Sequence, residues 1–217
     1  PPVRHPTRRG TVPVTSLLHD IATNAGVLVT LVFAFAALSW PFDEVDPQEK
    51  ARRANRRRLV CGLVFGLGAI LTMNMPVTVA LGVIVDGKTV ILSLAGAYLH
   101  PIGAAAALLV AGAYRWSLGG AGLVAGVGIL VGVTLVGLVF GAQRRRIMRA
   151  FGGPDSAYAA TLWLAGLGLA TSAVAVCLVL LLPAPIRWGV FQRVALPVML
   201  VFPPATLAFG FPDLIFG

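Results

Sequence analysis

The chain has 217 residues, of which 58% are hydrophobic and only 12% are charged. Together with a mean hydropathy of +0.89, this composition excludes an ordinary soluble domain and predicts an all-α, polytopic transmembrane helical bundle. The net charge of +9 does not indicate nucleic-acid binding, because the arginines gather in two short segments beside apolar runs, where the positive-inside bias places them.

The first elements can be read directly along the chain. Residues 1–14 are expected to form a flexible N-terminal tail, and the apolar run Thr15–Trp40 is long enough to span a bilayer. The segment 41–58, with four acids and six bases, is predicted to be a loop, and residues 59–75 form a second apolar run. Because basic residues favour the cytosolic side, we expect the second span to begin there.

The middle of the chain contains an apolar stretch that a proline interrupts. Residues 89–116 are apolar throughout except at the sequence LHPIG, which places Pro101 in the centre. Proline removes a backbone hydrogen bond and disfavours helical conformation at the residue before it, His100. We therefore predict a hairpin of two short helices, Thr89–Leu99 and Pro101–Trp116; a single kinked span is the alternative.

Three further spans are predicted at about Gly120–Gly141, at Ala157–Leu182 and at about Val190–Gly210, which makes seven helical segments. With the N-terminus outside, this topology puts ten basic residues inside and seven outside. A single kinked span would give eight inside and nine outside, so the positive-inside bias favours the hairpin.

The span that begins near Gly120 is rich in glycines with small-xxx-small spacing. They are Gly122, Gly126, Gly128, Gly132, Gly137 and Gly141. Such glycines let helices approach one another closely. Packing inside one bundle is the favoured interpretation, and a dimer interface is the alternative.

An acid and a base lie two residues apart in the sequence VIVDGKTVI, at Asp86 and Lys88. In the predicted topology this loop and Arg115 both reach the outer side. Ionisable residues beside apolar spans are costly and usually face a partner or an aqueous cavity. Lys88 and Arg115 are therefore candidates for binding a small anion, with Asp86 orienting one of them. Further candidate hydrogen-bonding residues are Asn74, Thr89, Tyr114 and Ser117.

The same residues also have a purely structural interpretation. Asp86 would cap the helix that begins near Gly87, Lys88 would pair locally, and Arg115 would extend to the lipid headgroups beside Trp116. The residue pattern alone leaves both interpretations open.

Patterns typical of enzymes and metal sites were not found. His5, His19 and His100 have no metal-ligand spacing to one another or to Cys61 and Cys177. The sequence has no phosphate loop, no nucleophile elbow and no paired intramembrane carboxylates. We expect no catalysis, no cofactor and no metal in this chain.

Four patterns follow one another between Leu59 and Phe140: the helix GLVFGLGAILTMNM, the loop VDGKT, the turn LAGAYLHPIG and the exit YRWSLGGAG. In this combination the segment resembles the membrane module of five-transmembrane receptors of the LytS/YhcK type. The corresponding patterns of that family are GllfGl…sm, G-v-D-x-R, alag…G-P and yR-x-x-x-GG-x-G. The spans on either side fit the family more loosely.

Several residues can be matched to the family's patterns. Asp86 matches the acid of the loop, and Arg115 matches the arginine of the exit. Lys88 stands where the family usually has arginine, and a lysine acts as a point charge rather than as a bidentate fork. The family's glycine turn is matched by Gly119, Gly120 and Gly122.

This resemblance implies a sensor domain in the inner membrane of a bacterium, with residues 59–210 as its core and 15–217 as the whole transmembrane domain. In such receptors the module precedes a cytosolic histidine kinase or diguanylate cyclase, and the VDGKT loop is more similar to the cyclase-linked branch. The resemblance also implies a homodimer, and a small anion such as a carboxylate as the ligand. The short-helix hairpin is similar to that of the substrate-binding subunits of energy-coupling-factor transporters. A transport component and a membrane anchor without a ligand are the alternatives.

Overall fold

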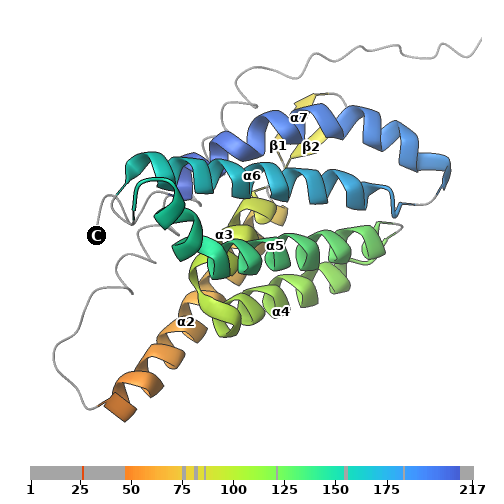
Figure 1. Ribbon diagram of the computed structural model, residues 1–217. Coiled ribbons are helices and arrows are strands. Elements are labelled where there is room, and N and C mark those ends of the chain that lie inside the picture. The colour runs from red at the N-terminus through yellow and green to blue at the C-terminus, as the bar shows by residue number, and fades with distance from the viewer. Residues whose placement is uncertain are drawn as a thin grey trace, which may run out of the picture.

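The computed structural model describes Gly26 and the ranges 47–74, 77–80, 83–85, 87–120, 122–153, 156–182 and 184–210. In chain order (Figure 1) the elements are α2 (Pro47–Asn74), β1 (Val77–Ala80), β2 (Val83–Val85), α3 (Lys88–Tyr98), α4 (His100–Leu118), α5 (Leu123–Ala150), α6 (Ala157–Val179) and α7 (Ala184–Gly210). The predicted all-α class is confirmed, with six of the seven predicted segments present as helices. The tail 1–14 and, apart from Gly26, the expected first span lie outside the described residues.

Close contacts at glycines establish how the helices run relative to one another. If Gly62 of α2 carried a Cβ atom, it would lie only 2.9 Å from the Cβ of Ala106. A Cβ atom on Gly66 would lie 2.7 Å from the Cβ of Val110. Both contacts join α2 to α4, and the residue numbers increase together. The two helices are therefore parallel.

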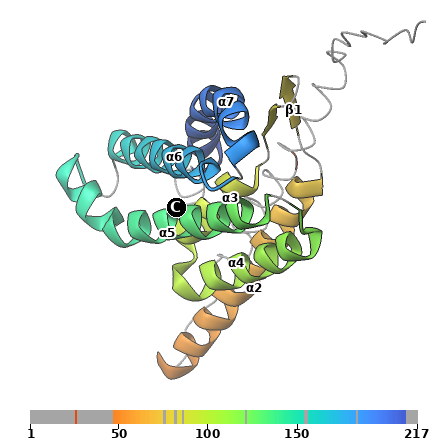
Figure 2. The same ribbon diagram turned by 90° about the vertical axis from the view of Figure 1, so that its right-hand side faces the viewer.

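The same reasoning applies to α3 and α5. A Cβ on Gly137 of α5 would lie 3.0 Å from the carbonyl carbon of Ser93, and one on Gly141 would lie 2.6 Å from the oxygen of Ala97. These helices are also parallel, and they approach backbone to backbone. The helices α6 and α7 then run antiparallel to each other beside them (Figures 1 and 2).

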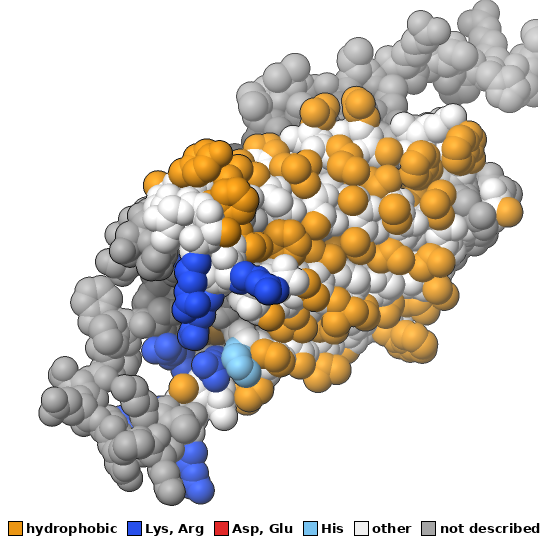
Figure 3. All heavy atoms as spheres, in the orientation of Figure 1, with side chains coloured by type: hydrophobic (Ala, Val, Ile, Leu, Met, Phe, Trp, Pro, Cys, Tyr) orange, Lys and Arg blue, Asp and Glu red, His pale blue; other side chains and the backbone are white. Residues whose placement is uncertain are grey.

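The bundle has two chemically different ends. At one end α2 and α6 begin, α5 ends, and the α3–α4 hairpin turns; we call it the basic end. Its described arginines are Arg52, Arg53, Arg56, Arg57, Arg58, Arg144, Arg145, Arg146 and Arg149. Figure 3 shows Lys and Arg side chains gathered at one end of a face that is otherwise largely hydrophobic. At the opposite end α4 and α6 terminate, and α5 and α7 begin.

The predicted short-helix hairpin is confirmed. Leu99, between α3 and α4, has φ −90° and ψ 5°, and His100 adopts a positive φ of 63°. Pro101 lies in the first turn of α4, where its missing N–H would have had no partner in the helix. The proline therefore ends one helix and starts the next.

Several predicted boundaries were wrong. The predicted loop 41–58 is too long, because α2 already begins at Pro47 and contains residues 47–58. The helix α5 continues past the predicted end at Gly141 to Ala150. Both extensions are rich in Arg and Ala, which have high helix propensity and carry a helix beyond its apolar part. α5 ends at Ala150, shortly before Gly152 and Gly153, which have positive φ values of 115° and 96° that do not continue a helix.

A short β-hairpin that the sequence analysis did not predict precedes α3. Strands β1 and β2 pair antiparallel, with Val77 opposite Val85 and Thr78 opposite Ile84. These β-branched residues favour extended backbone. β2 also contacts α7, so the chain that leads into α3 is held against the last helix.

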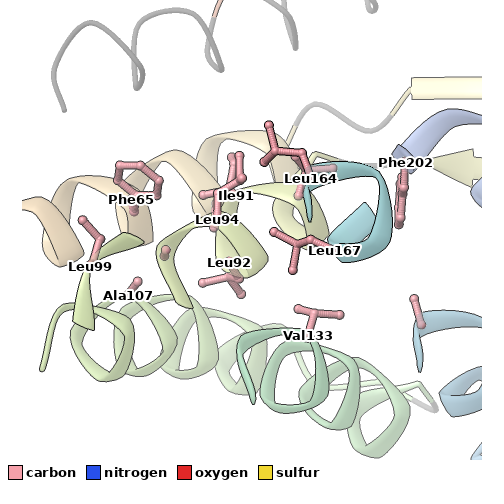
Figure 4. Close-up of a cluster of buried hydrophobic side chains, with 14 of the residues drawn as sticks. Phe65, Ile91, Leu92, Leu94, Leu99, Ala107, Val133, Leu164, Leu167 and Phe202 are labelled. Carbon is pink, nitrogen blue, oxygen red and sulfur yellow. The ribbon is translucent and has the colours of Figure 1, made fainter. Parts of the chain in front are cut away.

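The helix α3 lies at the centre of the bundle. All residues from Thr89 to Gly96 are buried, and α3 contacts α2, α4, α5, α6 and α7. In Figure 4 its side chains Ile91 and Leu92 lie among residues of neighbouring helices, including Val133 and Leu164. A short helix that could not span a bilayer alone is thus enclosed by longer ones.

The outer surface is apolar. Among the residues that the structure describes, three helices are long and apolar enough to cross a membrane: Arg52–Asn74, Leu123–Ala150 and Ala157–Val179. Their outward residues include Leu67, Leu135 and Leu169, each more than half exposed. Large exposed leucines along long helices are typical of a surface in contact with lipid.

Candidate functional site

The described candidate site residues lie toward the end opposite the basic end. The end of α2 provides Asn74, and the end of α4 provides Tyr114. The hydroxyl of Tyr114 donates a 2.6 Å hydrogen bond to Oδ1 of Asn74, although the two residues are 40 positions apart. Nδ2 of Asn74 donates to the carbonyl of Ile70 at 2.9 Å, which orients the amide. The sequence analysis selected both residues but did not predict that they bond to each other.

Arg115 occupies the last turn of α4 and folds over the first turn of α5. Its Nη1 donates to the carbonyl of Gly119 at 3.0 Å. A Cβ on Gly126 would lie 3.1 Å from Cζ of Arg115, and one on Gly122 would lie 3.6 Å from Nη2. The guanidinium therefore uses the space that two glycines leave on one face of α5.

The glycines before α5 form the turn that makes this arrangement possible. Gly119 and Gly120 have φ values of 61° and 89°, a backbone region that residues with a Cβ rarely adopt. Gly122 is the N-cap residue of α5. Because the connection is so short, the end of α4 lies directly beside the start of α5. Gly126 was missed as a site residue, although its place one turn after Gly122 was the available signal.

The charge of Arg115 is placed unfavourably. The N-terminus of a helix carries partial positive charge and attracts anions rather than cations. In the ranges that the structure describes, no Asp or Glu side chain lies against this guanidinium. An anion at this position would interact favourably with both Arg115 and the start of α5.

Lys88 lies deeper in the bundle than Arg115. Ser93 of α3 faces Gly137 of the parallel helix α5, so Lys88, five residues before Ser93, lies at the height of about residue 132. Arg115 lies over Gly126 instead. Six residues of helix correspond to roughly 9 Å along the axis. Figure 1 shows α3 beginning well short of the end where α4 and α5 meet.

The remaining predicted residues have different surroundings. Thr89 is only 3% exposed and belongs to the core. Ser117 is exposed, and its hydroxyl donates to the carbonyl of Tyr114 at 2.8 Å within the same helix. Asp86 lies outside the described residues, and the N-cap residue of α3 is Gly87. The structure thus joins Asn74 to Tyr114 and turns Thr89 inward.

The glycines of α5 serve contacts within the chain. Besides those that meet Arg115, a Cβ on Gly132 would lie 2.9 Å from Cγ1 of Val174, and Gly137 and Gly141 meet the backbone of α3. The interpretation that these glycines pack one bundle is confirmed. Close approach without a Cβ is the physical reason for them.

These features define a polytopic helical membrane protein that has most of its arginines at one end and a polar site toward the other. The family model 5TM-5TMR_LYT, described as 5TMR of 5TMR-LYT, matches residues 42–211, a range that contains α2 to α7. The chain belongs to this family, the five-transmembrane sensor module of LytS-type receptors. The resemblance stated from the sequence is therefore confirmed. No curated protein and no solved structure matches the chain, so the similarity to energy-coupling-factor subunits stays a prediction.

Proposed function

We propose that this chain is the ligand-binding membrane domain of a bacterial signalling receptor in the inner membrane. It detects a small anion from the outer side and controls a cytosolic histidine kinase or diguanylate cyclase as a homodimer. The positive-inside bias supports this orientation, because the basic end would face the cytosol and Arg115 the outside. The observation that carries the proposal is the position of Arg115 over the first turn of α5.

The chemistry of this position favours a carboxylate. A guanidinium binds a carboxylate through two parallel hydrogen bonds, and the helix N-terminus adds a favourable field. Neither contribution is offset by an acidic side chain within the described residues. A ligand that also reached Lys88 would have to enter the bundle, since this lysine lies roughly 9 Å deeper along the helix axis.

The central position of α3 suggests how binding is transmitted. Lys88 is the first residue of α3, and the rest of that helix is enclosed by five others. A shift at Lys88 cannot be absorbed by a surface loop, because the core around Ile91 and Leu92 is closely packed. The ligand selects between two packings only to the extent that its affinity for them differs.

The test is binding of small carboxylates to the purified chain in lipid nanodiscs, measured by isothermal titration calorimetry. Truncation of a buried charged partner typically costs about 2 to 5 kcal/mol, so Arg115→Ala should weaken binding roughly thirtyfold or more. For a ligand that reaches both cations, Lys88→Arg should retain or increase affinity, because a guanidinium can form two parallel hydrogen bonds with a carboxylate and lysine cannot. The control is Arg146→Ala, which removes an exposed arginine at the basic end.

Equal affinity of Arg115→Ala and the wild-type chain would reject this site. Failure of every mono- and dicarboxylate to bind the folded wild-type chain would reject the ligand class. An equal loss in Arg146→Ala would indicate a general effect of charge rather than a contact with Arg115.

A further inference from the structure

A cavity of about 550 Å³ lies at the basic end, far from the site described above. Its lining includes Gly141 of α5 and Ala97 of α3, whose backbones are in close contact. Tyr98 and the buried Met148 form apolar walls. The remaining lining residues are all cationic: Arg144, Arg145 and Arg149.

Arg144 is held in place by two aromatic rings. Its Cζ lies 5.4 Å from the ring centroid of Tyr98 and 5.4 Å from that of Trp163. The two rings are arranged edge to face, with their centroids 5.6 Å apart. Nε1 of Trp163 donates to the carbonyl of Phe140 at 3.0 Å, which fixes the indole. Cation–π contacts on both rings thus position one guanidinium of the cavity between α3 and α6.

Arg145 and Arg149 differ from Arg144 because they are exposed and have no partner within the described chain. They lie one helical turn apart on α5, so their side chains are neighbours. Neither makes a hydrogen bond or an ion pair with any described residue. Two adjacent cations without counterions repel each other, and an anion bound between them would relieve that repulsion.

The cavity also continues a surface that faces lipid. Val131, Leu135 and Val139 form an exposed apolar stripe along α5. Arg149 follows Val131 by 18 residues, which is about five helical turns, so it extends the same stripe into the basic end. Figure 3 shows the corresponding pattern, with cationic side chains directly beside the hydrophobic face.

We propose that this cavity binds the phosphate-bearing headgroup of an anionic phospholipid. Guanidinium groups bind phosphate oxygens bidentately, and basic pockets between transmembrane helices on the cytosolic side suit such headgroups. A lipid is favoured over free phosphate because its acyl chains would lie on the stripe at Val131 and Leu135 while its phosphate meets Arg145 and Arg149. The cavity volume of about 550 Å³ also exceeds what a single phosphate ion needs.

The test uses the full chain in nanodiscs of phosphatidylcholine that contain increasing fractions of phosphatidylglycerol. Native mass spectrometry counts the retained phosphatidylglycerol, and the thermal unfolding midpoint reports its effect. The test variant is the double substitution Arg145→Gln with Arg149→Gln. The matched control is Arg52→Gln with Arg56→Gln, which removes two exposed arginines with the same spacing at the same end, but outside the cavity.

We expect the wild-type chain and the control to retain phosphatidylglycerol and to be stabilised by it. The cavity variant should bind it at least about tenfold more weakly, because it loses two guanidinium contacts to the phosphate. If the glutamine variant does not fold, the pair Arg145→Lys with Arg149→Lys replaces it. The lysine variant keeps both charges but cannot form the paired hydrogen bonds of a guanidinium. Its affinity for phosphatidylglycerol should therefore fall below that of the wild-type chain.

Three outcomes would overturn the proposal. Equal retention of phosphatidylglycerol by the wild-type chain and the folded cavity variant would show that the cavity is not the site. Equal losses in the cavity variant and the control would assign the effect to the overall charge of the basic end. Inorganic phosphate that stabilises the chain in pure phosphatidylcholine and abolishes the response to phosphatidylglycerol would replace the lipid with a soluble anion.

Discussion

At the scale of single residues, the position of Arg115 depends on the absence of a side chain at Gly126. A Cβ there would overlap Nε of Arg115, which can move away because it belongs to a flexible side chain. We therefore expect Gly126→Ala to fold normally but to displace the guanidinium from the start of α5. Carboxylate affinity, measured by titration calorimetry, should fall severalfold.

The control for this substitution is Gly128→Ala on the same helix. A Cβ at Gly128 would lie 3.4 Å from Cδ1 of Leu181, which is an ordinary contact distance. Unchanged affinity in Gly126→Ala would mean that the guanidinium does not need its position over α5 to bind the ligand.

Other residues show what the sequence could predict at this scale. Pro101 identified the break between α3 and α4, because its effect on the preceding residue is local. The bond between Asn74 and Tyr114 could not be predicted, since it requires two distant helices to run parallel. The stacking of Arg144 on two rings was missed for the same reason.

At the scale of elements, α3 and α5 approach so closely that a side chain at Gly137 would collide with the backbone of α3. A Cβ on Gly137 would overlap the carbonyl oxygen of Ser93 and would lie 3.0 Å from Cα of Gly96. Backbone atoms cannot rotate away as a side chain can. We expect Gly137→Ala to lower the free energy of unfolding by about 1 to 3 kcal/mol or more, measured by unfolding in detergent.

Gly112→Ala on α4 should have the opposite effect. A Cβ at that position would have no heavy atom within 4 Å, and alanine favours a helix interior over glycine by about 0.5 to 1 kcal/mol. A loss of stability in Gly112→Ala as large as in Gly137→Ala would show that the loss in Gly137→Ala does not come from the close α3–α5 contact.

At the scale of the whole molecule, the arrangement of the helices separates two groups of residues that a labelling experiment can distinguish. Gln143 lies at the basic end, and Leu118, which is 54% exposed, lies at the opposite end. Because arginines favour the cytosolic side, a cysteine at Gln143 should resist an impermeant thiol reagent in intact cells. A cysteine at Leu118 should react readily. The reverse pattern would invert the topology and move the proposed anion site to the cytosol.

The sequence by itself determined the membrane class, the helical segments from 59 onward and the short-helix hairpin. These properties depend on hydropathy over about 20 residues and on proline, which act within a single segment. The arginine clusters likewise indicated which ends of the helices lie together. The start of α2 and the end of α5 were predicted wrongly, because residues of high helix propensity extend both helices beyond their apolar runs.

Only the tertiary structure decided which side chains meet. The sequence named Arg115 and the glycines of α5 separately, but the packing of α4 on α5 placed the guanidinium over Gly122 and Gly126. Tyr98, Arg144 and Trp163 come from three helices, and nothing in any one of those helices requires the other two. The physical reason is that contacts between helices depend on crossing geometry and side-chain packing, which a local pattern of residues does not encode.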